Sequence, residues 1–148
     1  DGEGANTNLP LPSGCGHDAY LYAIERVVLP LIQSFRPDII IIANGLDASH
    51  VDPLGRMSCL SATYAQMTSM IMAAADEHCG GRVVAIHEGG YSEAYVPFCG
   101  HRVVESLAGI ESDLVDPFLP KFLEQQPDAA QVAQQCAAID AMAARLGL

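Results

Sequence analysis

The chain has 148 residues, which is the size of one ordinary domain. Half of the residues are hydrophobic and 17% are charged, a balance that supports a packed core and excludes a largely disordered chain. The formal net charge of -11, with seven Lys and Arg residues in total, excludes nucleic acid and anionic membrane surfaces as partners.

The first third of the sequence predicts an extended segment, a helix and a strand. Residues 1–16 are rich in Gly, Pro, Asn and Ser, which favours an extended path with turns. Apolar residues then recur at helical spacing from Asp18, a plausible cap, to Phe35, with Pro30 expected to kink the helix or end it a turn early. The continuous β-branched run from Ile39 to Ala43 predicts a strand buried on both faces of a parallel sheet.

The middle of the chain repeats this alternation. A long loop spans residues 44–60, and a helix capped by Ser61 is expected to run to Glu77, before Gly80-Gly81. Residues 82–87 form a second buried strand, and Ser92 caps a third helix that ends at Gly109. This order predicts an α/β fold in which the two strands are parallel neighbours joined by a crossover helix.

The pattern of residues changes after Ser112. Residues 114–123 are interrupted by prolines, and Asp128 caps a last helix with an apolar stripe made of Val132, Cys136, Ile139, Met142 and Leu146. Such a stripe is typical of a helix docked on its own domain. We therefore divide the chain into residues 1–112, which belong to one domain, and 113–148, a helical extension packed on it.

Two fully apolar strands cannot make a stable parallel sheet with both faces and both edges covered. Further strands must come from another segment, from another chain or from a dimer made through the sheet edge. We therefore expect a homo-oligomer.

The cysteines and the N-terminal residues indicate the cellular compartment of the protein. Five cysteines are widely spaced and never form a C-x-x-C pair, as is typical of reduced thiols in a cytosolic protein. The first residues are polar, so no signal peptide is expected, and the longest apolar run, Ile39 to Ala43, is too short to span a membrane. We expect a cytoplasmic protein.

Two loops leave the carboxyl ends of the strands, where an open α/β sheet binds its ligands. The first contains Asp47 and Asp52, and the second reads Glu88-Gly89-Gly90-Tyr91. A carboxylate can hold a metal, and a phenol can donate a hydrogen bond to an oxyanion. Each feature alone is weak, because an Asp after a strand and a Gly-Gly pair are more often plain turn residues.

Taken together, these motifs resemble the C-terminal half of the histone deacetylases. The resemblance rests on G-x-D-x-x-x-x-D-P at residues 45–53, on E-G-G-Y at 88–91 and on Val28-Leu29-Pro30, and it extends from about Gly4 to Gly109. It is closest to the bacterial class-II-type deacetylase-like amidohydrolases. It implies part of an open parallel-sheet, three-layer fold of the arginase and deacetylase type, with the N-terminal half absent and residues 1–112 forming the C-terminal part of the deacetylase domain.

The resemblance also implies a reaction and roles for residues. The reaction is zinc-dependent hydrolysis of the amide in acetylated lysine or an acetylpolyamine-type substrate. Asp47 would be a zinc ligand, and Tyr91 would donate a hydrogen bond to the tetrahedral intermediate. Leu54 would line the channel for the acyl-lysine chain, with Gly89 and Gly90 on the wall beside Tyr91.

The family takes further zinc ligands from an Asp-x-His motif on an earlier strand and its general base from a pair of histidines. The chain has no histidine pair, and its one such string, Asp76-Glu77-His78, is expected to be solvent-exposed at a helix end. A catalytic zinc needs about three protein ligands. We therefore expect Zn²⁺ in a complete family member and none bound by this chain alone.

The remaining candidates are weaker. His50 is expected to be a solvated loop residue, and His17 and His101 surface or helix residues. Asp52 is expected to brace its own loop, and both Asp52 and His87 are candidates for indirect support of the site. The chain is thus either part of a deacetylase, inactive alone, or a non-catalytic α/β oligomerising module derived from a truncated deacetylase gene. A phosphate-binding domain is disfavoured, because no G-x-G-x-x-G or Walker loop is present.

Overall fold

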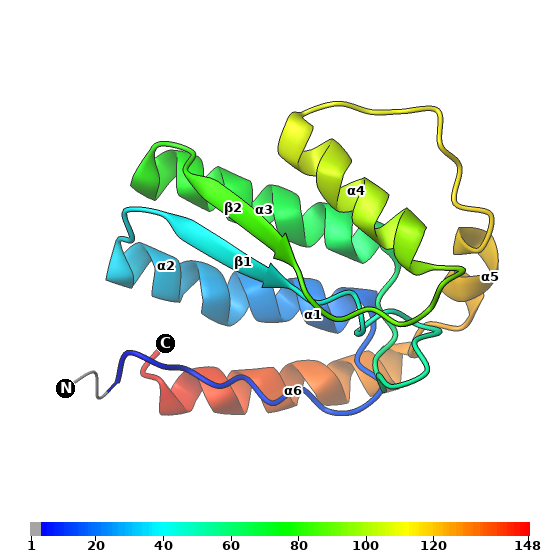
Figure 1. Ribbon diagram of the computed structural model, residues 1–148. Helices are drawn as coiled ribbons and strands as arrows, with labels where there is room; N and C mark the ends of the chain where they lie inside the picture. The colour runs from blue at the N-terminus through cyan, green and yellow to red at the C-terminus, as the bar shows by residue number, and fades with distance from the viewer. Residues whose placement is uncertain (1–3) are drawn as a thin grey trace.

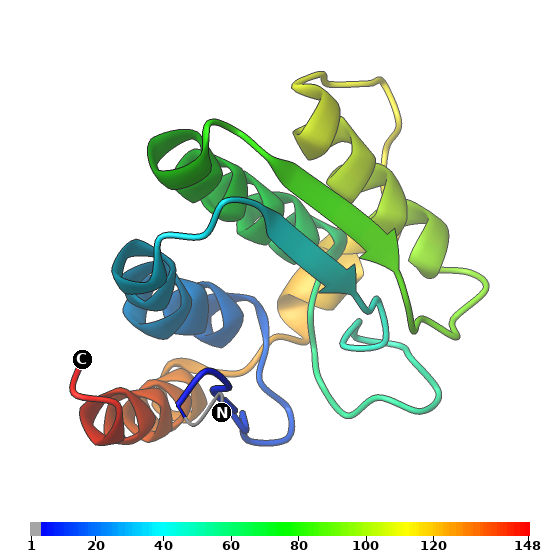
Figure 2. The same ribbon diagram turned by 60° about the vertical axis from the view of Figure 1, so that its left-hand side comes forward.

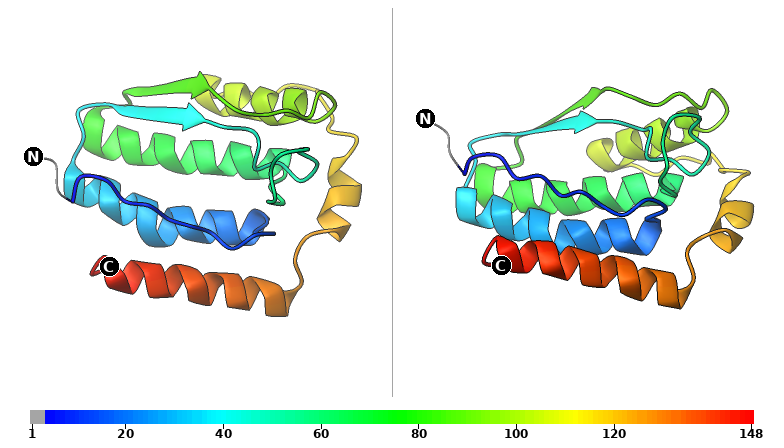
Figure 3. Two further views of the ribbon diagram at one scale, coloured as in Figure 1. Left: turned by 60° about the horizontal axis from the view of Figure 1, so that its bottom comes forward. Right: turned by 90° about the horizontal axis from the view of Figure 1, so that it is seen from below.

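The computed structural model describes residues 4–148, so the first three residues of the expected extended segment lie outside it. Two strands form an outer layer, a tier of helices lies beneath them, and the last helix lies furthest from the sheet (Figures 1 and 3). No helix of the described part is long and apolar enough to cross a membrane. The elements are α1 (His17–Ala23), η1 (Ile24–Val28), α2 (Leu29–Phe35), β1 (Ile40–Asn44), α3 (Ser61–Cys79), β2 (Val83–His87), α4 (Val96–Ala108), α5 (Leu119–Glu124) and α6 (Ala129–Arg145).

The first long helix runs without interruption from His17 to Phe35 as α1, η1 and α2. Pro30 removes one backbone donor, and its ring would clash with the carbonyl four residues earlier. That carbonyl belongs to Arg26 in the π-helical turn η1, whose wider turn makes room for the proline ring. The expected early end at Pro30 is therefore wrong: the helix continues to Phe35 and is followed by Arg36, whose φ is 52°.

β1 and β2 are parallel neighbours, as the sequence predicted. Ile40 pairs with Val83 at one end and Asn44 pairs with His87 at the other. Helix α3 connects the strands, so the two loops that follow them leave the same edge of the sheet. The α/β fold with a parallel sheet is confirmed.

One face of the sheet packs on helices and the other is open. In Figure 2 the strands face the viewer and the helices lie behind them. Ile41, Val84 and Ile86, which we call the open face, are 62%, 44% and 48% exposed. The prediction that both strands are buried on both faces is therefore wrong for this chain, because its helices cover one face. The inference that these strands need further neighbours agrees with the open face.

The main core lies beneath the two loops. Leu46 and Leu60 from the first loop pack with Tyr64 of α3, Tyr95 before α4 and Phe122 of α5. A second cluster joins α1 and η1 to α6.

The serine caps are placed differently from expectation. Helix α3 begins at Ser61, but the Ser61 hydroxyl donates to the buried carboxylate of Asp116 at 2.6 Å, and the hydroxyl of Thr63 accepts the N–H of Leu60 at 2.9 Å. α4 begins at Val96, four residues after Ser92. Ser61 is drawn into a tertiary contact with Asp116, whereas the carbonyl of Ser92 accepts the N–H groups of Tyr95 and Val96 in a turn before α4.

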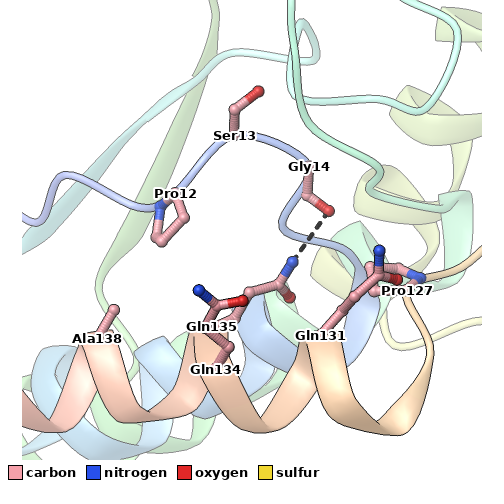
Figure 4. A pocket seen from close by; sticks show the side chains of 8 residues that line it. All are labelled: Pro12, Ser13, Gly14, Pro127, Gln131, Gln134, Gln135 and Ala138. Atoms are coloured by element: carbon pink, nitrogen blue, oxygen red, sulfur yellow. Dashed lines mark hydrogen bonds between the residues drawn. The ribbon is translucent and has the colours of Figure 1, made fainter.

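The tail helix α6 is capped by Asp128, whose carboxylate accepts the N–H of Gln131 at 2.8 Å, as predicted. Its buried residues Ile139 and Ala143 pack on α1. The side-chain amide of Gln135 donates to the carbonyl of Gly14 at 3.3 Å, beside a cavity of about 360 Å³ (Figure 4). No candidate site residue lines this cavity.

The division of the chain into residues 1–112 and a helical extension of residues 113–148 stays a prediction.

Candidate functional site

The loop of residues 44–60 (the first loop) and the loop of residues 88–95 (the second loop) are joined by backbone hydrogen bonds. The N–H of Leu46 donates to the carbonyl of Gly89 at 2.7 Å, and the N–H of Glu88 donates to the carbonyl of Asn44 at 3.2 Å. These bonds extend the pairing of β1 and β2 beyond the strands. Residues that follow both strands are thereby held together at one edge of the sheet.

The side chain of Asp47 lies between two glycines. A Cβ atom added at Gly45 would lie 2.8 Å from Oδ1 of Asp47, and one added at Gly89 would lie 2.5 Å from Oδ2. Both distances are shorter than real Cβ contacts allow. Gly45 and Gly89 therefore leave the space that the carboxylate of Asp47 occupies.

Asp52 connects the first loop to the second. Its Oδ1 accepts the N–H groups of Leu54 and Gly55 at 2.8 and 2.9 Å, and its Oδ2 accepts the N–H of Tyr91 at 2.8 Å. The residue is 8% exposed. Burial raises the pKa of its carboxyl, but the three N–H donors outweigh burial and hold the pKa below its ordinary value. The expected bracing of its own loop is present, and the bond to Tyr91 adds a link that the sequence did not predict.

Tyr91 and Leu54 are exposed, at 53% and 68%, on the two loops that leave this edge. Gly90 precedes Tyr91 with φ of 136°, and a Cβ atom there would lie 2.9 Å from Cβ of Leu46. The chain therefore needs glycine at position 90 both for its backbone angle and for its contact with the first loop. This brings all five residues that the sequence marked for metal or substrate contact onto two adjoining loops: Asp47, Leu54, Gly89, Gly90 and Tyr91.

The expectation that His50 is solvated is wrong. Its Nε2 lies 2.9 Å from Oε1 of Gln125, and its ring lies 4.8 Å from that of Phe122. Its Nδ1 is buried. Helix α5 thus packs against the first loop, a contact that sequence reasoning missed. The spacing of Phe118 and Phe122, four residues apart, was the available signal that α5 buries an aromatic face.

The other histidines lie outside this arrangement. His87 is exposed at the end of β2, and its ring makes no hydrogen bond within residues 4–148. His17 begins α1, where its Nδ1 lies 2.9 Å from Oγ1 of Thr63. Asp76-Glu77-His78 lies at the end of α3, as predicted, with Asp76 and Glu77 exposed; His78 departs from expectation, because its side chain is only 14% exposed.

No group of three or more His, Cys, Asp and Glu side chains that could hold a metal ion occurs among the described residues. The carboxylate of Asp47 is a suitable hard ligand with space cleared around it, but one carboxylate does not make a zinc site. Residues 4–148 therefore supply one ligand of such a site and not a complete set.

Comparisons with known proteins show the family of this chain. Residues 1–107 match the histone deacetylase domain. The chain is 51% identical over 148 residues to a histone deacetylase-like amidohydrolase of Pseudomonas aeruginosa and 34% identical over 135 residues to a probable deacetylase of Archaeoglobus fulgidus. Among solved structures, the histone deacetylase Clr3 superposes with a TM-score of 0.71 at 29% identity, covering 94% of this chain and 22% of that one.

The fold is thus that of deacetylase domains, an α/β architecture with a parallel sheet. The chain belongs to the histone deacetylase family. The alignment with the Pseudomonas relative covers 99% of this chain but 39% of that protein. The alignment with the Archaeoglobus relative covers 88% of this chain but 38% of that protein.

Proposed function

We propose that this segment supplies part of the active site of a zinc-dependent amidohydrolase that removes acetyl groups from lysine or polyamine-like amines. The observation that carries the proposal is the joining of the Asp47 and Tyr91 loops at one sheet edge, through Leu46–Gly89 and Asp52–Tyr91 hydrogen bonds. A ligand carboxylate and an exposed phenol on adjoining loops form two sides of a site for amide hydrolysis.

Each residue has a distinct task in this proposal. Asp47 is one ligand of the zinc ion, which when bound polarises the amide carbonyl and its attacking water. Tyr91 donates its phenolic hydrogen to the oxygen on which negative charge develops. Leu54, exposed on the first loop, offers an apolar wall to the methylene chain of the substrate. The remaining ligands and the general base come from outside residues 1–148 in this proposal.

The charge of the chain supports an amine-bearing substrate. The acetylated nitrogen of the substrate is a neutral amide, so a net charge of -11 favours the free amines of an acetylpolyamine or the basic residues near an acetylated lysine, and it disfavours nucleic acid. Reduced cysteines support a cytoplasmic location, and no nucleic acid or membrane partner is expected.

A second candidate is a non-catalytic module that oligomerises through its sheet. The observation in its favour is the open face, where three large apolar side chains are 44% to 62% exposed. This module would share the ancestry of the enzyme and lack its reaction.

Activity of the full-length protein that carries this segment distinguishes the two. We expect hydrolysis of a fluorogenic acetyl-lysine substrate that stops with a chelator and returns with zinc. Asp47→Asn should weaken zinc binding, whereas Asp38→Asn, at an exposed position before β1, should not. A full-length protein that hydrolyses neither acetyl-lysine nor acetylpolyamine would favour the non-catalytic module.

A further inference from the structure

We propose that Asp52 is a positioning residue that fixes the backbone of Tyr91 against the Asp47 loop. Its catalytic consequence rests on the proposed function, but the structural link itself does not. The two oxygens of its carboxylate have separate partners. Oδ1 takes the N–H groups of Leu54 and Gly55, and Oδ2 takes the N–H of Tyr91, 39 positions further along the chain.

Tyr91 has few constraints on its backbone besides the bond to Asp52. It follows two glycines, its side chain is 53% exposed, and the bond to Asp52 is the one hydrogen bond that Tyr91 makes within residues 4–148. The carbonyl of Gly89 accepts the N–H of Leu46, and Gly90 lies against Leu46, but neither contact holds Tyr91 itself. The bond from the N–H of Tyr91 to the carboxylate of Asp52 supplies that constraint.

A carboxylate suits this task and an amide does not. An ionised Asp accepts at both oxygens, and all three of its partners here are donors. In Asp52→Asn the side chain has one oxygen. Two hydrogen bonds are kept if this oxygen accepts from Leu54 and Gly55, but only one is kept if it accepts from Tyr91. The amide nitrogen then faces the N–H of Tyr91, a donor against a donor. The substitution therefore preserves the turn in the first loop and breaks the link between loops.

The catalytic test is a double-mutant cycle in the full-length protein. Asp52→Asn should lower kcat on the order of 10–100-fold, with KM and zinc content unchanged, because small misplacement of a catalytic group is costly. In a Tyr91→Phe background the same change should lower kcat less than about 2-fold, since the hydroxyl through which Asp52 acts is gone. Asp113→Asn, at an exposed position, is the matched control and should have no effect in either background.

Equal losses in the two backgrounds would overturn the proposal and leave Asp52 a general stabiliser of the loops. If circular dichroism shows that Asp52→Asn does not fold, Asp52→Ser is the second variant that keeps the turn in the first loop and removes the link to Tyr91. Its short hydroxyl can accept from the first loop but cannot reach Tyr91.

A second measurement does not depend on activity. The backbone amide of Tyr91 should exchange with solvent slowly in the wild-type protein and at least about 10-fold faster in Asp52→Asn, because its acceptor is lost. Equal exchange rates would refute the link even in an active enzyme. A protein with no amidohydrolase activity but the expected change in exchange would refute the proposed function and retain the positioning role.

Discussion

The carboxylate of Asp47 lies directly against the backbone of Gly89. A Cβ atom at Gly89 would be 2.5 Å from Oδ2 and 2.9 Å from Cγ of Asp47. The glycine in the second loop is therefore needed by a residue of the first loop. This contact gives a steric reason for the first glycine of E-G-G-Y that needs no reference to the substrate.

Gly89→Ala should displace the carboxylate of Asp47. The new methyl group cannot fit while Asp47 keeps its position, and a short side chain has little freedom to move away. We expect the affinity of the full-length protein for zinc to fall on the order of 10–100-fold, as is typical when the support of a metal ligand is lost. Competition with a chromogenic chelator measures it.

Gly100→Ala is the matched control for that substitution. Gly100 lies inside α4, and its added Cβ would meet Cδ1 of Leu46 at 3.5 Å, an ordinary contact. The change should leave zinc affinity unaltered and stabilise the helix by about 0.5–1 kcal/mol. Equal zinc affinity in Gly89→Ala and Gly100→Ala would show that Asp47 does not need the space at Gly89.

Tyr91→Phe should slow amide hydrolysis while zinc stays bound. The change removes one donor to the developing oxyanion, which typically costs on the order of 100–1,000-fold in turnover. Because the ring of Tyr91 is half exposed and its hydroxyl makes no hydrogen bond within the described residues, the fold should be unaffected. Steady-state kinetics with zinc analysis of the same sample checks both parts. Full activity in this variant would refute the role of Tyr91.

The sequence predicted the parallel strand pair and the loops that carry Asp47 and Tyr91, because apolar runs and loop motifs are local signals. It could not predict the contact of His50 with Phe122 and Gln125, since more than 70 residues separate the partners (75 for Gln125). The bond from Tyr91 to Asp52 was missed because it also joins residues far apart in the sequence, 39 positions in this case. The sequence overestimated the burial of the strands. Their hydrophobicity shows that both faces of the sheet need to be covered, but it does not show whether the helices of these 148 residues cover both.

Glu105 should make stability depend on acid pH. Hydrogen bonds from the hydroxyl and the N–H of Ser112, together with Arg102, lower the pKa of Glu105 from 4.5 to about 2. The imidazole of His101 also faces this carboxylate, with its Nε2 3.2 Å from Oε1 of Glu105. A depressed pKa in the folded state stabilises the fold above the unfolded pKa, and that stabilisation is lost as pH falls from about 4.5 towards about 2.

Urea unfolding between about pH 6 and about pH 2.5 measures this effect. Glu105→Gln should be less stable than wild type at the upper pH, and the difference should shrink as the solution becomes acidic. Glu93→Gln is the matched control, because Glu93 is exposed and makes no hydrogen bond or ion pair in the described part. A constant difference across the pH range would exclude Glu105 as the source.

The 148-residue chain by itself should self-associate. The open face exposes Ile41, Val84 and Ile86, and the sheet of the described residues has two strands whose outer edges are unpaired. Light scattering should therefore give a mass above that of one chain. Replacing Ile41 and Ile86 by Glu should lower that mass, whereas Val115→Glu, at a 76% exposed position between α4 and α5, should not.

The same sample should contain no stoichiometric zinc and should not hydrolyse a fluorogenic acetyl-lysine substrate. Asp47 is one ligand where about three are needed, and the residues proposed here include no base to deprotonate the attacking water. Metal analysis and the assay should be run on the fraction used for light scattering, so that mass, metal and activity describe one species. A monodisperse monomer that hydrolyses the substrate and is inhibited by a chelator would contradict the prediction, because residues 1–148 would then supply every ligand that the reaction requires.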